Sequence, residues 1–233
     1  AIFPPSATIA GNQVLGGLRW KAGDVVYVTP FEHNAVMRVL HALQAQYGFY
    51  IEELAVDAGT LEMDKEKIRH QFLRNPPAVL VMSHVSNVTG AILPFQEIAA
   101  MAEKYQATVV VDGSQALGVV PVCLKNTFVD FYIFAGHKAL YGPMGIGGYV
   151  DNSGKTLKPV LFGGTGSDSL SLEMGQDGIR MYEPGSMNVV AIAGLLAAVG
   201  EAGMGGERWL QEEQRLRQRL LEKAFPNRPQ PAD

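Results

Sequence analysis

The chain has 233 residues, of which 47% are hydrophobic and 18% are charged, and its net charge is −4. This composition excludes a mainly disordered chain, and the acidic balance argues against a nucleic-acid partner. The longest apolar run, residues 189–199, is shorter than the roughly 20 residues that span a bilayer, so we expect no membrane segment. Residues 1–11 contain no basic residue, so we expect no signal peptide. The single cysteine excludes an internal disulfide and a multi-cysteine zinc site, and favours a reducing, cytoplasmic location.

Helix-like and strand-like patterns alternate along the chain. In chain order they predict a helix over 9–18, a strand over 24–28, a helix over 34–47, a strand over 49–54, a helix over 64–72, a strand over 78–82, a helix over 94–105 and strands over 108–112, 130–135 and 145–150. A last, amphipathic surface helix is expected over about 207–223, with Leu216 and Leu220 in its apolar stripe. The strands 78–82 and 108–112 are apolar at nearly every position, as in strands buried on both faces. The alternation predicts an α/β fold with a mostly parallel central sheet flanked by helices.

Polar side chains follow four of the predicted strands, at the point where each strand ends. They are Glu32, His33 and Asn34 after the first, Ser83, His84, Ser86 and Asn87 after the third, Asp112, Ser114 and Gln115 at the fourth, and His137 and Lys138 after the fifth. Parallel α/β sheets bind ligands at the carboxyl ends of their strands. The sequence therefore predicts one site at that edge.

Lys138 lies in a glycine-rich segment after the predicted strand 130–135. At such an edge a lysine can hold a phosphate as a point charge, or it can form a Schiff base with a carbonyl compound. The Walker A pattern is absent, so a nucleotide-phosphatase site is not indicated. A solvated loop lysine is the ordinary alternative, because most lysines are exposed.

Asp112 ends a strand of Thr and Val, so its carboxylate is expected at the edge of a dry core. Such a carboxylate needs a cationic or hydrogen-bonding partner, and a protonated pyridine nitrogen is one; capping the turn at Gly113 is the alternative. Gln115 could reach the same ligand as a neutral donor, or be a simple turn residue. His33 could stack flat on a ring, or be an ordinary histidine near a helix N-terminus.

Two segments have the composition of anion-binding loops. Residues 6–8, Ser-Ala-Thr, precede the first predicted helix, whose N-terminus suits a phosphate. Residues 163–167, Gly-Gly-Thr-Gly-Ser, could form a nest of backbone amides. Both compositions are also common in ordinary loops.

The remaining candidate ligands and nucleophiles point to no further site. The five histidines show no metal-ligand spacing, so we predict no metal site. Cys123 is expected to be a buried or half-buried structural thiol rather than a reactive one.

Three longer runs carry a specific pattern: SHVSNVTG at 83–90, VDGSQALG at 111–118 and AGHKALYGPMGIGG at 135–148. Shorter segments at 6–8, 32–34, 163–167 and 180–188 accompany them. Together and in this order, these segments resemble the class V aminotransferase group of fold-type I enzymes that use pyridoxal 5′-phosphate (PLP). Within that group they are most similar to the cysteine desulfurases, over roughly residues 4–225.

The resemblance implies a PLP cofactor and a role for each matching residue. Lys138 would hold the cofactor as a Schiff base and move the α-proton of the substrate. Asp112 would pair with the pyridinium nitrogen, and Gln115 would bond the phenolic oxygen of the ring. His33 would stack on the ring face, and Asn87 would lie near the ring or the substrate; Lys138 and His33 are the catalytic residues implied.

The resemblance also implies how the phosphate is held and how the chain is organised. Thr8 and His137 would hold the phosphate, and Thr165 would reach the phosphate of the neighbouring subunit, because these enzymes resemble one another in being homodimers with shared sites. Residues 1–205 would form the PLP-binding large domain, with an N-terminal segment missing. Residues 206–233 would form a linking helix and the truncated start of a small C-terminal domain. We therefore expect the chain to be a piece of a longer protein.

The chain departs from the family pattern in three ways. Ala135 stands where many relatives carry a Ser that contacts the phosphate. Cys123 precedes Lys138, so it is not the family's sulfur-accepting cysteine, which lies well after the lysine. The arginine that binds the substrate carboxylate in the family is likewise expected in a part that this sequence does not contain.

Three functions remain open from the sequence. The first is a PLP-dependent enzyme acting on a small amino acid, with carbon–sulfur bond cleavage of the cysteine desulfurase type. The second is a class V aminotransferase that moves an amino group to an oxo acid, because both activities use the same cofactor motifs. The third is a non-catalytic fragment or binding module that keeps only the fold.

Overall fold

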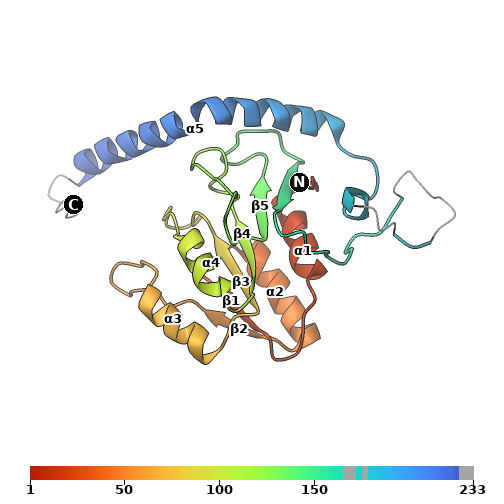
Figure 1. Cartoon of the computed structure of the whole chain (residues 1–233). Coiled ribbons are helices and arrows are strands. Elements are labelled where there is room, and N and C mark those ends of the chain that lie inside the picture. Colours follow the sequence, from red (N-terminus) through yellow and green to blue (C-terminus); the bar gives the residue numbers. More distant parts are fainter. Residues whose placement is uncertain (165–171, 175–177, 226–233) are drawn as a thin grey trace.

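The computed structural model describes residues 1–164, 172–174 and 178–225, without the side chains of 204–207. The helices are α1 (Ala7–Gly17), α2 (Asn34–Tyr47), α3 (Lys65–Arg74), α4 (Phe95–Glu103) and α5 (Val189–Ala224), with a short 3₁₀ helix at Gly178–Met181. The strands are β1 (Val25–Val28), β2 (Tyr50–Glu53), β3 (Val79–Ser83), β4 (Thr108–Asp112), β5 (Phe131–Ala135) and β6 (Gly147–Asp151). Figure 1 shows the strands in the centre, with α5 arching across one end.

The six strands form one sheet in the order β2-β1-β3-β4-β5-β6. The first five are parallel, and β6 runs antiparallel to β5. This arrangement confirms the predicted α/β fold with a mostly parallel sheet. It also brings the carboxyl ends of β1, β3, β4 and β5 to one edge.

The alternation of strand side chains divides the core into two layers. Val26, Val81 and Val110 face α1 and α2, whose buried residues include Val14 and Leu40. On the other face, Leu80, Met82, Val109, Val111 and Tyr132 pack against α3 and α4 through Ile68, Phe72, Ile98 and Ala102. All five residues of β3 and of β5 are buried, because helices cover both faces of these central strands.

Local signals in the sequence place the helix ends. Asp64 caps α3 by accepting a hydrogen bond from the backbone N–H of Lys67, so the helix begins at Lys65. Gly48 ends α2 in the left-handed conformation, with φ of 72°. Ser6 caps α1 through the backbone N–H of Ile9, so α1 begins at Ala7 and not at Ile9.

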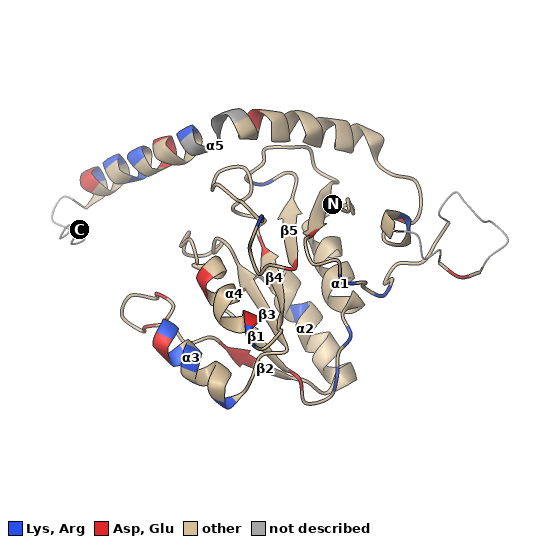
Figure 2. Ribbon diagram, in the orientation of Figure 1, with Lys and Arg blue, Asp and Glu red and all other residues tan. Residues whose placement is uncertain are grey.

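The last helix is longer than predicted. α5 begins at Val189 instead of about residue 207, because Ala191 and Leu195 pack on Phe134 and Leu140 and stabilise a glycine-rich first half. Most of its charged residues lie in its C-terminal half (Figure 2). The expected boundary between residues 205 and 206 falls within this helix and stays a prediction.

Leu216 and Leu220, in the apolar stripe of the amphipathic surface helix predicted for the tail, are exposed. Among the described residues, no single helix is long and apolar enough to cross a membrane. Val189–Gly203 and Arg208–Ala224, which meet at a 71° bend, pass that test only as a pair.

The expectation that Cys123 is a buried or half-buried thiol was wrong. Cys123 is exposed and lies in the irregular segment between β4 and β5.

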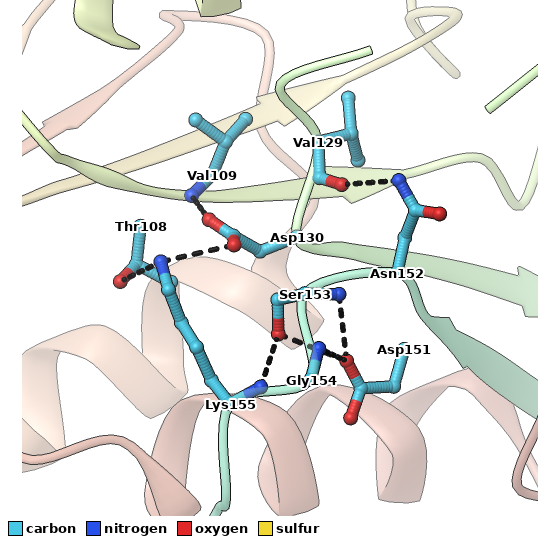
Figure 3. Close-up of polar contacts among 9 residues, drawn as sticks. All are labelled: Thr108, Val109, Val129, Asp130, Asp151, Asn152, Ser153, Gly154 and Lys155. Carbon is cyan, nitrogen blue, oxygen red and sulfur yellow. Dashed lines mark hydrogen bonds and ion pairs between the residues drawn. The ribbon is translucent and has the colours of Figure 1, made fainter. Parts of the chain in front are cut away.

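The amino-terminal edge of the sheet is closed by paired polar groups (Figure 3). Asp130 accepts a hydrogen bond from the backbone N–H of Val109 (2.8 Å) and forms an ion pair with the ammonium of Lys155 (2.9 Å). The same ammonium donates to Thr108 Oγ1 at 3.1 Å. Asn152 Nδ2 donates to the carbonyl of Val129 at 3.1 Å. These bonds connect the start of β4, the start of β5 and the end of β6.

Candidate functional site

A small pocket lies at the carboxyl-terminal edge of the sheet. Its lining comes from the ends of β1, β3, β4 and β5: His33, Ser83, Val85, Asn87, Asp112, Ser114, Gln115 and Lys138. Parallel strands bring these side chains together because all of them follow the carboxyl end of a strand. The predicted convergence is therefore observed for the seven polar residues of this lining, whereas the other strand-end residues, Glu32, Asn34, His84, Ser86 and His137, do not line the pocket.

Lys138 is held in the pocket by the tight segment after β5. The backbone N–H of Gly136 bonds the carbonyl of Ile146, and the N–H of Tyr141 bonds the carbonyl of Lys138 at 2.8 Å. A Cβ on Gly136 would lie 2.8 Å from Ile146 Cγ2, so glycine allows this close approach. The Lys138 side chain is half-buried, and its ammonium has no hydrogen bond or ion pair with any described residue. A lysine so placed is available to a ligand.

Asp112 is fixed at the end of β4. It is in register with Ser83 of β3, and its Oδ1 accepts a hydrogen bond from the backbone N–H of Ser114 at 2.9 Å. This is the turn contact that the sequence left open as an alternative. The Oδ2 atom has no donor among the described residues, so the carboxylate is oriented by the turn and can still accept a bond from a ligand.

Ser114 supplies a polar atom to which no other described residue forms a hydrogen bond. Its side chain is buried, and the Oγ atom has no hydrogen-bond partner in the described structure. A buried hydroxyl without a partner is unfavourable unless a ligand or water meets it. Ser114 was not among the predicted site residues, although it lies between Asp112 and Gln115, which were.

His33 combines a structural role with its place in the pocket. It caps α2, and its Nδ1 accepts a hydrogen bond from the backbone N–H of Ala35 at 3.0 Å. An accepting Nδ1 carries no hydrogen, so in the neutral ring the hydrogen is on Nε2. The cap fixes one edge of an otherwise exposed ring. Both the ordinary helix-terminus interpretation and the proposed place in the site therefore apply to His33.

Glu32 joins the ends of β1 and β3 immediately beside the pocket. Its Oε1 accepts bonds from the Ser83 N–H (2.7 Å) and the Thr29 hydroxyl (2.5 Å), and its Oε2 accepts one from the Ser83 hydroxyl (2.9 Å). Burial raises the pKa of Glu32 to about 7, against these three bonds, and the nearby charge of Asp112 also raises it. The sequence placed Glu32 at a strand end but gave it no role.

His84 follows Ser83 and points the other way, into the core. Its Nδ1 lies 2.8 Å from the hydroxyl of Tyr132, and its ring packs edge-on against Phe95. Burial lowers the pKa of His84 to about 4, so the ring is neutral at pH 7. Its alternation with Ser83 along the strand explains why adjacent polar residues face opposite sides.

The structure brings five of the eight predicted site residues into the pocket: His33, Asn87, Asp112, Gln115 and Lys138. Thr8 and His137 are exposed and do not line it, and Thr165 lies outside the described residues. Ser83, Val85 and Ser114 also line the pocket. The sequence placed Ser83 and Ser114 among the polar residues at the strand ends but gave neither of them a role in the site.

The N-terminus of α1 approaches the same strand end from the far side of β6. Gly147 of β6 pairs with Ala135, and a Cβ on Gly147 would lie 2.5 Å from the backbone N of Ala7 and from the carbonyl carbon of Ser6. The first turn of α1 therefore lies next to the segment that leads into His137. The phosphate-binding roles of Thr8 and His137 stay predictions.

A second, wider groove lies between α3 and β2, away from these strand ends. Two of its lining residues bond each other, since Asn75 donates to Glu52, while Gln71 donates to the carbonyl of Glu53 and Lys67 pairs with Asp64. The pocket at the carboxyl edge contains three polar groups without a partner among the described residues: the Lys138 ammonium, Asp112 Oδ2 and Ser114 Oγ. It is the better candidate for a ligand site.

The model of the family described as aminotransferase class V matches residues 1–227. The chain belongs to the class V aminotransferase family. A probable cysteine desulfurase of Chlamydia muridarum is 34% identical to it over 187 residues, which are 77% of this chain and 45% of that protein. A cysteine desulfurase of Yersinia pestis is 34% identical over 184 residues, 76% of this chain and 44% of that protein.

Solved structures agree with the family assignment. The apo cysteine desulfurase of Thermococcus onnurineus has a TM-score of 0.86 at 27% identity and matches 95% of this chain and 56% of its own. The cysteine desulfurase CsdA of Escherichia coli has a TM-score of 0.85 at 27% identity, over 98% of this chain and 58% of its own. A C-DES variant with glycine covalently linked to PLP has a TM-score of 0.75 at 28% identity, over 90% of this chain and 57% of its own. This class V aminotransferase family member has the fold-type I architecture and spans about half the length of the relatives it matches.

Proposed function

We propose that this chain forms the PLP-binding part of an enzyme that cleaves the carbon–sulfur bond of cysteine or a closely similar amino acid. One observation carries the proposal. Lys138 and Asp112 line one pocket at the carboxyl edge of the sheet, and neither the Lys138 ammonium nor Asp112 Oδ2 has a partner among the described residues. The cysteine desulfurases of the same family and fold supply the substrate class.

The residues present fit PLP group by group. The amine of Lys138 suits the aldehyde of the cofactor, and Asp112 suits its protonated ring nitrogen. Gln115 can donate to the phenolic oxygen, and the unpaired Oγ of Ser114 provides a further polar contact within the pocket. Each of these is an unmet bonding capacity of the protein itself, and PLP has a complementary group for each.

The phosphate would lie between the N-terminus of α1 and the segment after β5. Backbone N–H groups at a helix N-terminus favour an anion. Thr8 stands in this first turn, and Gly147 brings the turn against the strand that precedes His137. Ala135 contributes no hydroxyl here, so we propose that Thr8 and His137 hold the phosphate in this chain.

Bound PLP would withdraw electron density from the α-carbon of the amino acid. The protein's part is to bind, orient and move protons. Lys138 Nζ would anchor the cofactor and, once released, take the proton from the substrate Cα. Asp112 would keep the ring nitrogen protonated through its oriented carboxylate, and His33 would limit the position of the ring from one side. Asn87 would contact the ring or the substrate.

The direct test is an absorbance spectrum of the purified protein after addition of PLP. We expect a visible band that is absent in Lys138→Ala, and a mass increase on Lys138 after borohydride reduction. Asp130→Asn, at the opposite edge of the sheet, is the matched control and should keep the band. A well-folded protein that shows no Lys138-dependent band would overturn the proposal.

The substrate is tested separately with the loaded protein. Formation of alanine from cysteine in the presence of an added thiol reductant, which converts the released sulfane sulfur to sulfide, supports carbon–sulfur cleavage. Transfer of an amino group from an amino acid to an oxo acid, without sulfide release, would assign the site to the aminotransferase reaction instead. PLP binding without either turnover would leave the binding module that the sequence also allowed.

We further propose a cytoplasmic homodimer with shared sites. The single cysteine, which is exposed, suits a reducing compartment. The dimer, and the role of Thr165 toward a neighbouring subunit, rest on the resemblance to the family. Light scattering after size exclusion tests the dimer, and subcellular fractionation tests the location; a monomer that binds PLP fully would exclude shared sites.

A further inference from the structure

We propose that Glu32 is a positioning residue of this site. Its carboxyl group holds the ends of β1 and β3 together, and it gains or loses a proton when the charge on Asp112 changes. The inference rests on the proposed function only where it concerns bound PLP. The coupling of the two carboxyl groups is a property of the chain itself. It can therefore be tested with and without the cofactor.

The geometry makes Glu32 the connection between two strand ends. Its two oxygens bond Thr29 just after β1 and both the N–H and the hydroxyl of Ser83 at the end of β3. Ser83 is the register partner of Asp112 on β4. The three strand ends are thus joined through one carboxyl group.

Both neighbours of this connection line the pocket. Ser83 contributes to its wall, and so does His33, which follows Glu32 in the chain. A shift of the Glu32 carboxyl group would therefore move the pocket from two sides. This is the physical sense in which Glu32 positions the site without lining it.

The proton on Glu32 sets the direction of its bond to Ser83. Ionised Glu32 accepts the hydroxyl hydrogen of Ser83 at Oε2. Protonated Glu32 donates to Ser83 Oγ instead, because a hydroxyl both donates and accepts. The hydrogen of Ser83 is then free to point into the pocket, which Ser83 lines. The charge state of a group outside the pocket thus changes the donors inside it.

The charges around Glu32 explain why its protonation depends on the charge of Asp112. In the described part of the chain, no lysine, arginine or histidine nitrogen lies within ion-pair distance of Glu32. The titratable groups nearby are Asp112 on β4, His33 on its own loop, and Lys138, which enters the same pocket from the segment after β5. The negative charge of Asp112 favours the neutral form of Glu32.

A cation that pairs with Asp112 would relieve this effect. Binding of PLP with a protonated ring nitrogen is therefore expected to lower the fraction of Glu32 that is protonated. By linkage, ionised Glu32 stabilises the protonated ring in return. Glu32→Gln removes this contribution but keeps the shape of the side chain and an acceptor for the Ser83 N–H.

The first experiment follows the carboxyl ¹³C signals of the cofactor-free protein, labelled at Glu, as the pH is raised from 4 to 9. Glu32 is identified by the signal missing in Glu32→Gln. We expect it to titrate near pH 7, and we expect a lower midpoint in Asp112→Asn, because the charge of Asp112 adds to the effect of burial. Glu52→Gln, which alters a carboxyl group bonded to Asn75 outside the pocket, is the matched control and should leave the Glu32 signal unchanged.

The second experiment adds PLP and follows the pH midpoint of its Lys138-dependent visible band. We expect the Glu32 midpoint to fall on loading, and the band midpoint to differ between the native protein and Glu32→Gln but not Glu52→Gln. A Glu32 midpoint that is the same in the native protein and Asp112→Asn overturns the inference. Absence of a Lys138-dependent band would instead overturn the proposed function, and the cofactor-free titration would still decide the inference. Should Glu32→Gln fail to fold, the native and Asp112→Asn titrations are sufficient, with Glu32 assigned from its own backbone correlations.

Discussion

Two carboxyl groups at opposite edges of the same sheet differ in the partners that stabilise their negative charge. Asp130, at the amino-terminal edge, bonds a backbone N–H and pairs with the ammonium of Lys155. Glu32, at the carboxyl-terminal edge, has three hydrogen bonds but no cation partner among the described residues, and its pKa is raised to about 7. The comparison shows that the amino-terminal edge is closed by internal pairs. Within the described part of the chain, neither Glu32 at the carboxyl-terminal edge nor Lys138 in the adjacent pocket has an oppositely charged partner.

The same contrast appears in the glycines of the two edges and gives the largest expected effect. A Cβ on Gly113, between Asp112 and Ser114, would lie 2.1 Å from ring carbons of buried Tyr132. We expect Gly113→Ala to lower the free energy of unfolding by about 3 kcal/mol or more, because the ring has no space to move. Urea unfolding followed by circular dichroism measures this.

Gly154, in the loop after β6, is the control for that substitution. Its φ is +66°, and a Cβ there would meet nothing within 4 Å. Gly154→Ala should cost only about 1 kcal/mol, from the backbone conformation alone. Equal losses for the two variants would show that the strand end at Asp112 is not tightly packed.

The next effect concerns the pH dependence of stability at the carboxyl-terminal edge. Glu32 titrates near pH 7 in the folded chain and near 4.5 when unfolded, so its contribution to stability falls as pH rises between these values. His84 titrates near pH 4 when folded and near 6.5 when unfolded, so its contribution rises with pH over that interval. Between pH 4.5 and 6.5 the two slopes oppose each other.

Substitution of either residue should leave the pH dependence of stability that the other residue causes. We expect the stability of Glu32→Gln to rise with pH, and that of His84→Asn to fall, with each slope up to about 1.4 kcal/mol per pH unit steeper than in the native protein. Urea midpoints at several pH values between 4.5 and 6.5 measure both slopes. Parallel curves for the native protein and the two variants would contradict the pKa directions of both groups.

A smaller effect is expected when the pair at the amino-terminal edge is broken from the carboxylate side. Asp130→Ala removes the acceptor of the Val109 N–H in the sheet. An unsatisfied backbone donor costs about 1–3 kcal/mol, and we expect a loss of that size in the free energy of unfolding. The PLP band should be unaffected, because the pocket lies at the other edge; its loss would show that the two edges are coupled.

The smallest effect is expected from the cation of the same pair. The Lys155 side chain is 44% exposed, so water screens its ion pair with Asp130. Lys155→Met should cost less than about 1 kcal/mol, since the alkyl part is kept and Asp130 keeps its bond to Val109. A loss as large as that of Asp130→Ala would mean that the ion pair, and not the backbone bond, holds this edge.

Much of the site could be predicted because strand ends are local features. The run 108–112 contains only Thr, Val and a final Asp, so both the strand and the place of Asp112 at its end follow from the residues. His33 could be placed at the start of α2 for the same reason. Five predicted residues meet in the pocket because a parallel sheet brings the ends of its strands together.

The residues that sequence reasoning missed depend on neighbours far along the chain. Glu32 became important through Ser83, 51 residues away, and nothing in its own segment shows that bond. Ser114 is an ordinary turn residue until burial leaves its hydroxyl without a partner. The early start of α5 likewise depends on packing against Phe134 and Leu140, because its glycine-rich sequence is a poor helix former alone.

By itself, the sequence determined the alternation of strands and helices, the mostly parallel sheet and the cluster of polar residues at four strand ends. These follow from short-range patterns of apolar residues, turns and caps. Only the tertiary structure decided which polar groups are paired and which are left open. Burial, register and distance set the bonds of Glu32 and the opposite directions of Ser83 and His84, and they leave Lys138 without a partner among the described residues. These properties arise from contacts between segments that are distant in the chain.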